Sequence, residues 1–175
     1  MTAGVAGGGA ETPAGKVYRN ERYGYEVRYP QSWFASGIAY GNAYEIRNYP
    51  PRKPELRAPR NRATLLFVDM PMESRTDTAR FLDRVLAQGS NNTRRVSVVT
   101  IDGRRAVRVT QRLPEQVRGP GTGRPAPAKR TTLLHVKTFV PNGSFVLQLW
   151  GVVRLDARKE VIAEVIAIED SVTFS

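Results

Sequence analysis

The sequence predicts an α+β domain in which two main helices cover a central antiparallel sheet. Two hairpin signals, Asp102-Gly103 and Asn142-Gly143, each stand between two runs rich in β-branched residues, and both dipeptides suit a type I′ turn. Two amphipathic helix patterns complete the order strands, helix, two hairpins, helix. Because the helices do not alternate with single strands, the sheet is expected to be antiparallel.

One domain is expected to follow a short tail. Residues 1–16 are rich in glycine and alanine, so they are expected to be flexible. They lack the basic start and apolar core of a signal peptide, but could be the linker that remains when a signal or lipid-anchor segment is removed. Residues 17–175 contain no internal repeat beyond the two similar hairpins and form one predicted domain, long enough to bury a core.

Short strands are expected to open the domain. They are predicted at residues 17–19, 25–29 and 43–48. Tyr25, Val27 and Tyr29 alternate with charged residues and share one face. Pro30 ends that strand because it has no amide hydrogen for the ladder. The turn after it is expected to set Trp33 down as a large apolar anchor of the core.

The middle of the chain predicts a buried strand and the first helix. Residues 64–70 form an almost continuous apolar run, typical of a strand covered on both faces. Ser74 and Asp77 resemble a capping box at the start of a helix over residues 74–88. An apolar stripe follows at helical spacing. Gly89 is expected to end the helix as a left-handed cap.

Two-residue turns would fix the registers of the hairpins. In the first hairpin Val98 is expected to face Val107, and Val96 to face Val109, on the core side. The opposite face then carries the basic residues Arg95, Arg108 and Arg112.

In the second hairpin, Val140, Thr138 and Val136 are expected to face Phe145, Leu147 and Leu149, respectively. His135 then lies opposite Trp150 on the other face. A second helix is predicted over residues 157–170, capped by Asp156.

The net charge of +11 indicates an acidic or anionic partner, or simply solvated faces filled with arginine. The long connection over residues 114–130 is basic and rich in glycine and proline, and a loop of this length is usually functional or disordered. We expect it to contact the partner together with the polar face of the first hairpin. The predicted contact residues are Arg95, Arg108, Arg112, Arg118, Arg124, Lys129 and Arg130.

No catalytic motif, metal site or cofactor site is predicted. His135 is the only histidine and cysteine is absent, which excludes zinc sites built on histidine pairs or thiolates. No G-x-S-x-G elbow occurs. The glycine-rich residues 119–124 are followed by Pro-Ala-Pro, so they cannot lead into the helix that a phosphate-binding loop needs. Aromatic residues are not interleaved with most basic clusters, which does not favour a specific nucleic-acid reader.

Several motifs, taken in order, resemble the PsbP-like superfamily, which includes an extrinsic photosystem subunit, LpqN-type lipoproteins and a Ran-binding import factor. The matching features are Gly24-Tyr25, Tyr29-Pro30-x-x-Trp33, the strand at 64–70, the helix at 81–86, Ile101-Asp102-Gly103, the Asn142-Gly143 hairpin and the closing helix with its Asp-Ser-Val-Thr-Phe ending. The resemblance implies an α/β/α sandwich with a central antiparallel sheet. It also implies a non-catalytic binding or assembly-assisting module, often exported or lipid-anchored, so an extracytoplasmic location is favoured over a cytoplasmic one.

Two alternative functions remain open at this point. The protein could be a small-molecule or metal-binding protein, or a degenerate enzyme, with a pocket between sheet and helix near Trp33, Tyr44 and Asp69. Asp69 ends an apolar strand, and a carboxylate in that position can bind a cation or act as a base. The second alternative is non-specific binding of polyanions through charge alone.

Overall fold

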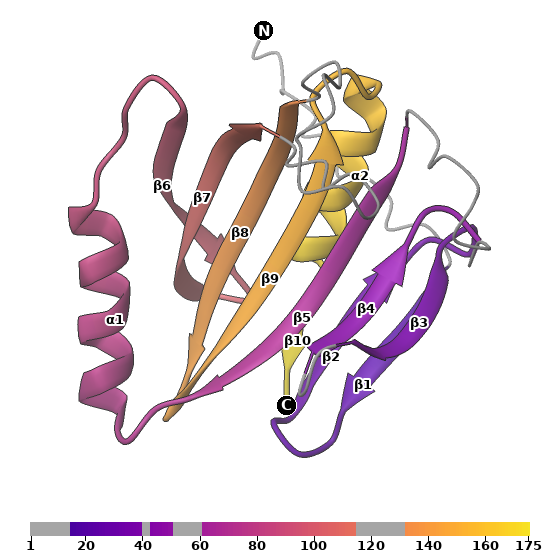
Figure 1. Ribbon diagram of the computed structural model, residues 1–175. Helices are drawn as coiled ribbons and strands as arrows, with labels where there is room; N and C mark the ends of the chain where they lie inside the picture. The colour runs from indigo at the N-terminus through magenta and orange to yellow at the C-terminus, as the bar shows by residue number, and fades with distance from the viewer. Residues whose placement is uncertain (1–14, 40–42, 51–60, 115–131) are drawn as a thin grey trace, which may run out of the picture.

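The computed structural model describes residues 15–39, 43–50, 61–114 and 132–175. Its largest element is a seven-stranded antiparallel sheet, and a three-stranded antiparallel sheet lies beside it (Figure 1). The large sheet runs in the order β3 (Phe34–Ala39), β4 (Ala43–Arg47), β5 (Ala63–Pro71), β9 (Phe145–Arg154), β8 (Thr132–Asn142), β7 (Arg104–Pro114) and β6 (Arg94–Ile101). The small sheet runs in the order β1 (Lys16–Asn20), β2 (Tyr25–Tyr29) and β10 (Thr173–Phe174).

The two helices pack on opposite faces of the large sheet. The first, α1 (Arg75–Ala87), contacts β7, β8 and β9, whereas α2 (Lys159–Asp170) contacts β2, β5 and β9. Leu82 and Val85 of α1 pack against one set of sheet residues that includes Val107. Val165 and Ile168 of α2 pack against a larger set on the other face. The predicted α+β sandwich with a central antiparallel sheet is confirmed.

Local signals placed the first helix and the first hairpin correctly. Ser74 caps α1 by accepting a hydrogen bond from the amide of Asp77 at 3.2 Å. Asp102 and Gly103 both have positive φ, 47° and 72°, as a type I′ turn requires. Val96 therefore faces Val109, and Val98 faces Val107, as predicted, but Val98 is 52% exposed and does not lie in the core.

The predicted register of the second hairpin is wrong by two residues. Asn142 pairs with Phe145, so the two turn residues are Gly143 and Ser144. Gly143 supplies the positive φ of 62° that the first turn position needs. Because a shift of two preserves the side-chain alternation, the expected residues still share one face. His135 now pairs with Val152, and Lys137 is the residue opposite Trp150.

Three further expectations need correction. The strand predicted over residues 64–70 is buried on one face only, because Leu65 and Phe67 are fully buried while Leu66 and Val68 are half-buried. Strands β3 and β10 were not predicted, and the predicted strands β1 and β2 pair with β10 in a separate sheet that was not expected. The second helix starts at Lys159, so its N-cap is Arg158 instead of Asp156, and its first turn has no side-chain cap. Asp156 binds Arg154 at 2.8 Å. No helix among the described residues is long and apolar enough to cross a bilayer.

Glycine at position 151 lets α2 lie close to the sheet. A Cβ atom added to Gly151 would stand 2.5 Å from Cγ1 of Val165 and 3.6 Å from the carbonyl oxygen of Val136. Val165 is a short branched side chain with no exposed surface, so it cannot swing away as a long flexible chain would. The separation between α2 and β9 therefore depends on the missing side chain.

We expect Gly151→Ala to lower the free energy of unfolding by about 1–3 kcal/mol, because the added methyl group overpacks the contact with α2. Chemical denaturation of the single variants and of Gly151→Ala/Val165→Ala gives a double-mutant cycle. The double variant is expected to lose less stability than the sum of the two single losses, since removing Cγ1 makes room for the methyl group. Strictly additive losses would show that this contact does not set the position of α2.

Candidate functional site

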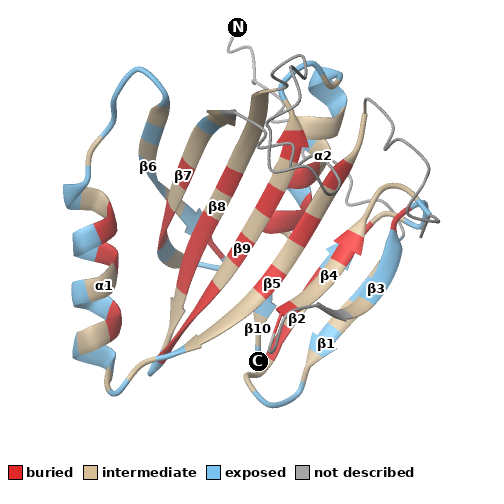
Figure 2. Ribbon diagram, in the orientation of Figure 1, coloured by how far each residue is buried: buried red, intermediate tan, exposed pale blue. Residues whose placement is uncertain are grey.

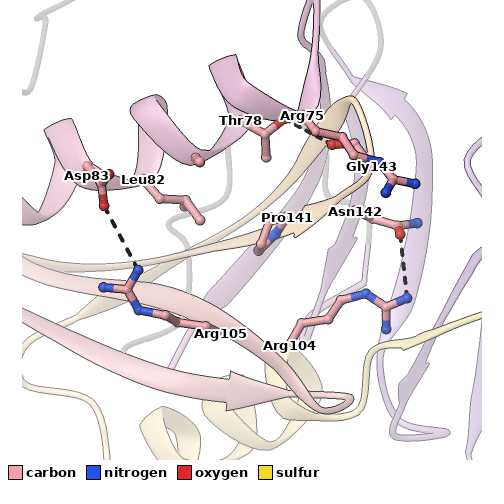
Figure 3. Close-up of a pocket in the computed structure, with 10 residues that line it drawn as sticks. Arg75, Thr78, Leu82, Asp83, Arg104, Arg105, Pro141, Asn142 and Gly143 are labelled. Carbon is pink, nitrogen blue, oxygen red and sulfur yellow. Dashed lines mark hydrogen bonds and ion pairs between the residues drawn. The ribbon is translucent and has the colours of Figure 1, made fainter.

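A cleft lies between the start of α1 and the turns of the two hairpins (Figure 3). Its volume is about 550 Å³, within the usual range for ligand sites. Three segments that are distant in sequence supply its walls. The lining residues are Arg75, Thr78, Ala79, Leu82, Asp83, Arg104, Arg105, Pro141, Asn142 and Gly143.

Two hydrogen bonds fix the start of α1 on the second hairpin. The hydroxyl of Thr78, which is buried, donates to the carbonyl oxygen of Gly143 at 3.2 Å. The amide of Met72 donates to the carbonyl oxygen of Ser144 at 2.7 Å. The α1 wall of the cleft is therefore joined directly to the second hairpin, by the Thr78 side chain and by the backbone.

Three arginines give the cleft its positive charge, against the single carboxylate of Asp83. Arg104 is engaged within the protein: it binds Asp102 at 2.7 Å and lies 4.4 Å from the ring centre of Phe174. Arg105 reaches Asp83 only at 3.9 Å, and both side chains are largely exposed. Arg75 is exposed and forms no ion pair with any described residue. Two arginines are thus available to an incoming anion.

The predicted pocket residues lie in and beside the core. Trp33 has no exposed surface, so it is a core anchor as expected and its side chain faces no solvent-filled space. Tyr44 is half-buried, and its ring stacks on Tyr18 with 3.9 Å between the ring centres. A ligand pocket built on Trp33, Tyr44 and Asp69 stays a prediction.

Asp69 lies where the two sheets meet and is held by β1. The side-chain amide of Asn20 donates to Oδ2 at 2.8 Å, while Oδ1 is buried and has no hydrogen-bond partner in the described structure. Burial raises the pKa of Asp69, and hydrogen bonds from Tyr25 and Asn20 partly offset this rise. No group of three or more potential metal ligands occurs among the described residues, so nothing there assembles a cation site around Asp69.

The predicted contact residues differ in where they lie and in whether the structure describes them. Arg95 and Arg112 are exposed on the first hairpin. Arg118, Arg124, Lys129 and Arg130 lie outside the described residues. Arg108, in contrast, has a side chain only 11% exposed and points toward α2. Its role as a partner contact stays a prediction that this geometry does not favour.

Arg108 belongs to a polar cluster beneath α2. Its guanidinium donates to the hydroxyl of Thr138 at 2.8 Å and binds Asp170 at 2.6 Å. The Thr138 hydroxyl donates to Glu169 Oε2 at 2.5 Å, and Arg108 Nε lies 3.3 Å from the same oxygen. Glu169 is fully buried, and its Oε1 has no hydrogen-bond partner among the described residues. Sequence reasoning missed Glu169. Its only sequence signal is a carboxylate next to the apolar stripe of a helix.

Comparison with known proteins identifies the fold. The sequence matches no protein-family model and no curated protein. Among solved structures, that of cyanobacterial PsbP from Synechocystis is similar, with a TM-score of 0.52 and 16% identity over 98% of both chains. LpqN of Mycobacterium tuberculosis, described as involved in cell envelope biogenesis, gives a TM-score of 0.55 and 15% identity over 91% of this chain and 90% of its own.

The chain has the PsbP-like fold. A protein of Bacteroides thetaiotaomicron also matches, with a TM-score of 0.55 and 12% identity over 92% of this chain. This chain spans about half, 48%, of the length of that protein. At these identities the likeness establishes the PsbP-like fold alone.

The buried carboxyl group of Glu169 is expected to make stability depend on pH. Burial raises its pKa from 4.5 to about 7, despite the opposing contacts with Thr138 and Arg108. Between these two values the folded state binds the proton and the unfolded state does not, so the free energy of unfolding falls as pH rises through about 7. The full loss is about 3 kcal/mol.

Denaturation at pH 5 and pH 8 tests this expectation with Glu169→Gln, which should reduce the loss of stability between the two pH values. Glu160→Gln changes an exposed glutamate of the same helix and should keep the dependence of the parent protein. A Glu169→Gln variant as sensitive to pH as the parent would contradict a raised pKa at this position.

Proposed function

We infer that this protein is a non-catalytic binding module that recognises an acidic segment of a protein partner through the arginine-lined cleft. The observation that carries this proposal is the presence of two exposed arginines, Arg75 and Arg105, on the walls of this cleft. An arginine side chain presents a planar fork of donors that matches a carboxylate. The likeness to PsbP and LpqN supports a binding role outside the cytoplasm for this chain.

The lining of the cleft favours a protein partner over nucleic acid. Apart from the arginines, its walls include Ala79, Leu82 and Pro141, and none of the described lining residues is aromatic. Single-stranded nucleic acids are usually held by stacking on aromatic rings. A mixed surface of apolar walls and arginine is instead typical of the centre of protein interfaces. Basic residues elsewhere on the surface would then increase the rate of encounter.

Neutralising both arginines should weaken binding of an acidic peptide. We expect Arg75→Gln/Arg105→Gln to bind a fluorescent hexaglutamate peptide about fivefold less tightly than the parent protein, because each exposed charge pair contributes up to about 1 kcal/mol. Fluorescence anisotropy at two salt concentrations measures both affinity and its dependence on charge.

A matched control removes the same charge from elsewhere on the same helix. Arg80 and Arg84 are exposed residues of α1 that do not line the cleft. Arg80→Gln/Arg84→Gln should therefore change the affinity much less than the cleft variant. Equal weakening by the two double variants would mean that the peptide responds to net charge alone, and the proposal would be replaced by non-specific polyanion binding.

A further inference from the structure

One face of the large sheet is only partly covered. Along β5 and β9, buried residues that face α2 alternate with half-buried residues on the other side. On that other side, α1 packs only against the part of the sheet that includes Val107 and Phe139. Next to this covered part, residues of β5, β8 and β9 are half-buried (Figure 2). The half-buried apolar residues of this open face are Leu66, Val68, Trp150 and Val152.

Two cations lie at the edge of this apolar surface. Lys137 pairs across the strands with Trp150, and its ammonium lies 4.6 Å from a Trp150 ring centre. Arg94 is one row away, opposite Gln111. Arg94 is close enough to affect Lys137: burial lowers the pKa of Lys137, and the charge of Arg94 lowers it further.

Neither cation has a carboxylate partner among the described residues. No ion pair joins Lys137 or Arg94 to a described acidic side chain, and Arg94 Nε is buried without a hydrogen-bond acceptor. Two half-buried positive charges close together, one of them with a donor that lacks an acceptor, have an unfavourable free energy. A bound anion would offset this cost. This arrangement differs from Arg108 on the opposite face, where Glu169 and Asp170 compensate the charge.

His135 adds a third donor. Trp150 Nε1 donates to His135 Nδ1 at 3.0 Å, so in the neutral imidazole the ring hydrogen is on Nε2. Burial lowers the pKa of His135, and the charge of Lys137 lowers it further. The histidine is therefore kept neutral with Nε2–H as a donor.

We propose that the open face of the sheet binds a small organic anion, whose carboxylate is held by Lys137 and Arg94 and whose apolar body lies on Trp150 and Leu66. The charge of the two cations is complementary to the carboxylate. Leu66 pairs with Trp150, and Trp150 pairs with Lys137, so the three residues form one row across the sheet. A ligand whose carboxylate lies at Lys137 would therefore place its apolar part over Trp150 and Leu66. The site is distinct from the arginine-lined cleft and does not depend on the function proposed for it.

The single histidine provides a direct measurement. The chain has one histidine, so NMR shows one imidazole, and its pKa reports the charge beside it. Benzoate is expected to raise the pKa of His135 by offsetting the charge of Lys137 and Arg94. Acetate, which has the same head group and almost no apolar body, should bind about fivefold less tightly because it buries less apolar surface. Inorganic phosphate shows whether an anion without any apolar body suffices.

Two variants test which residues hold the anion. Lys137→Gln should raise the pKa of His135 without ligand, and should weaken benzoate binding about tenfold or more, as the loss of a charged hydrogen bond implies. Arg94→Gln should weaken binding similarly and serves as the second test if Lys137→Gln does not fold. Arg75→Gln/Arg105→Gln should leave benzoate binding unchanged, so a failure at this site is separate from a failure at the cleft.

Three outcomes would overturn the proposal. A shift of the His135 signal by benzoate no larger than that caused by chloride at equal ionic strength would show screening only. Unchanged benzoate affinity in Lys137→Gln and Arg94→Gln would place the anion elsewhere. Phosphate binding as tightly as benzoate would remove the role of Trp150 and Leu66.

Discussion

The close approach of α2 to β9 at Gly151 is the constraint on which much of the structure depends. Because Val165 fills the space that a side chain at position 151 would occupy, α2 lies deep against the sheet. At that depth Glu169, four residues further along the helix, cannot reach solvent. The hydroxyl of Thr138 and the guanidinium of Arg108 then stabilise a carboxyl group that the packing has buried. The close contact between Gly151 and Val165 therefore explains why Glu169 is buried and needs polar partners.

The same layer arrangement explains why the other face is open. α1 contacts β7, β8 and β9 through the residues around Leu82 and Val85, and its first turn is bound to the second hairpin by Thr78. This attachment creates the arginine-lined cleft at one end of α1. It also leaves Trp150 and its neighbours beyond the reach of the helix and half-buried, whereas the residues of β5 and β9 that face α2 are buried. The position of α1 therefore accounts for both the arginine-lined cleft and the open face of the sheet.

The features of the fold that could be predicted are those that depend on residues close together in sequence. The capping box at Ser74 and the Asp102-Gly103 turn involve residues adjacent in sequence, so their patterns were sufficient. The second hairpin failed because Asn142-Gly143 and Gly143-Ser144 are both acceptable turns, and only pairing along the whole strand selects the second. The small sheet was missed because β10 joins β2 from the far end of the chain, and two residues carry no periodicity.

The candidate sites were harder to predict, since charge in a sequence does not show which charges are compensated in space. Arg108 looked like part of a solvated face, yet two carboxylates of α2 bind it. Arg104 is likewise occupied by Asp102 and the ring of Phe174. Arg75, Arg94 and Lys137 are separated in sequence and gave no motif, but among the described residues they have no acidic partner. A net charge of +11 therefore does not describe a uniform basic surface. Among the described residues, part of the charge is paired within the fold, as at Arg108, and part, as at Arg75, has no acidic partner.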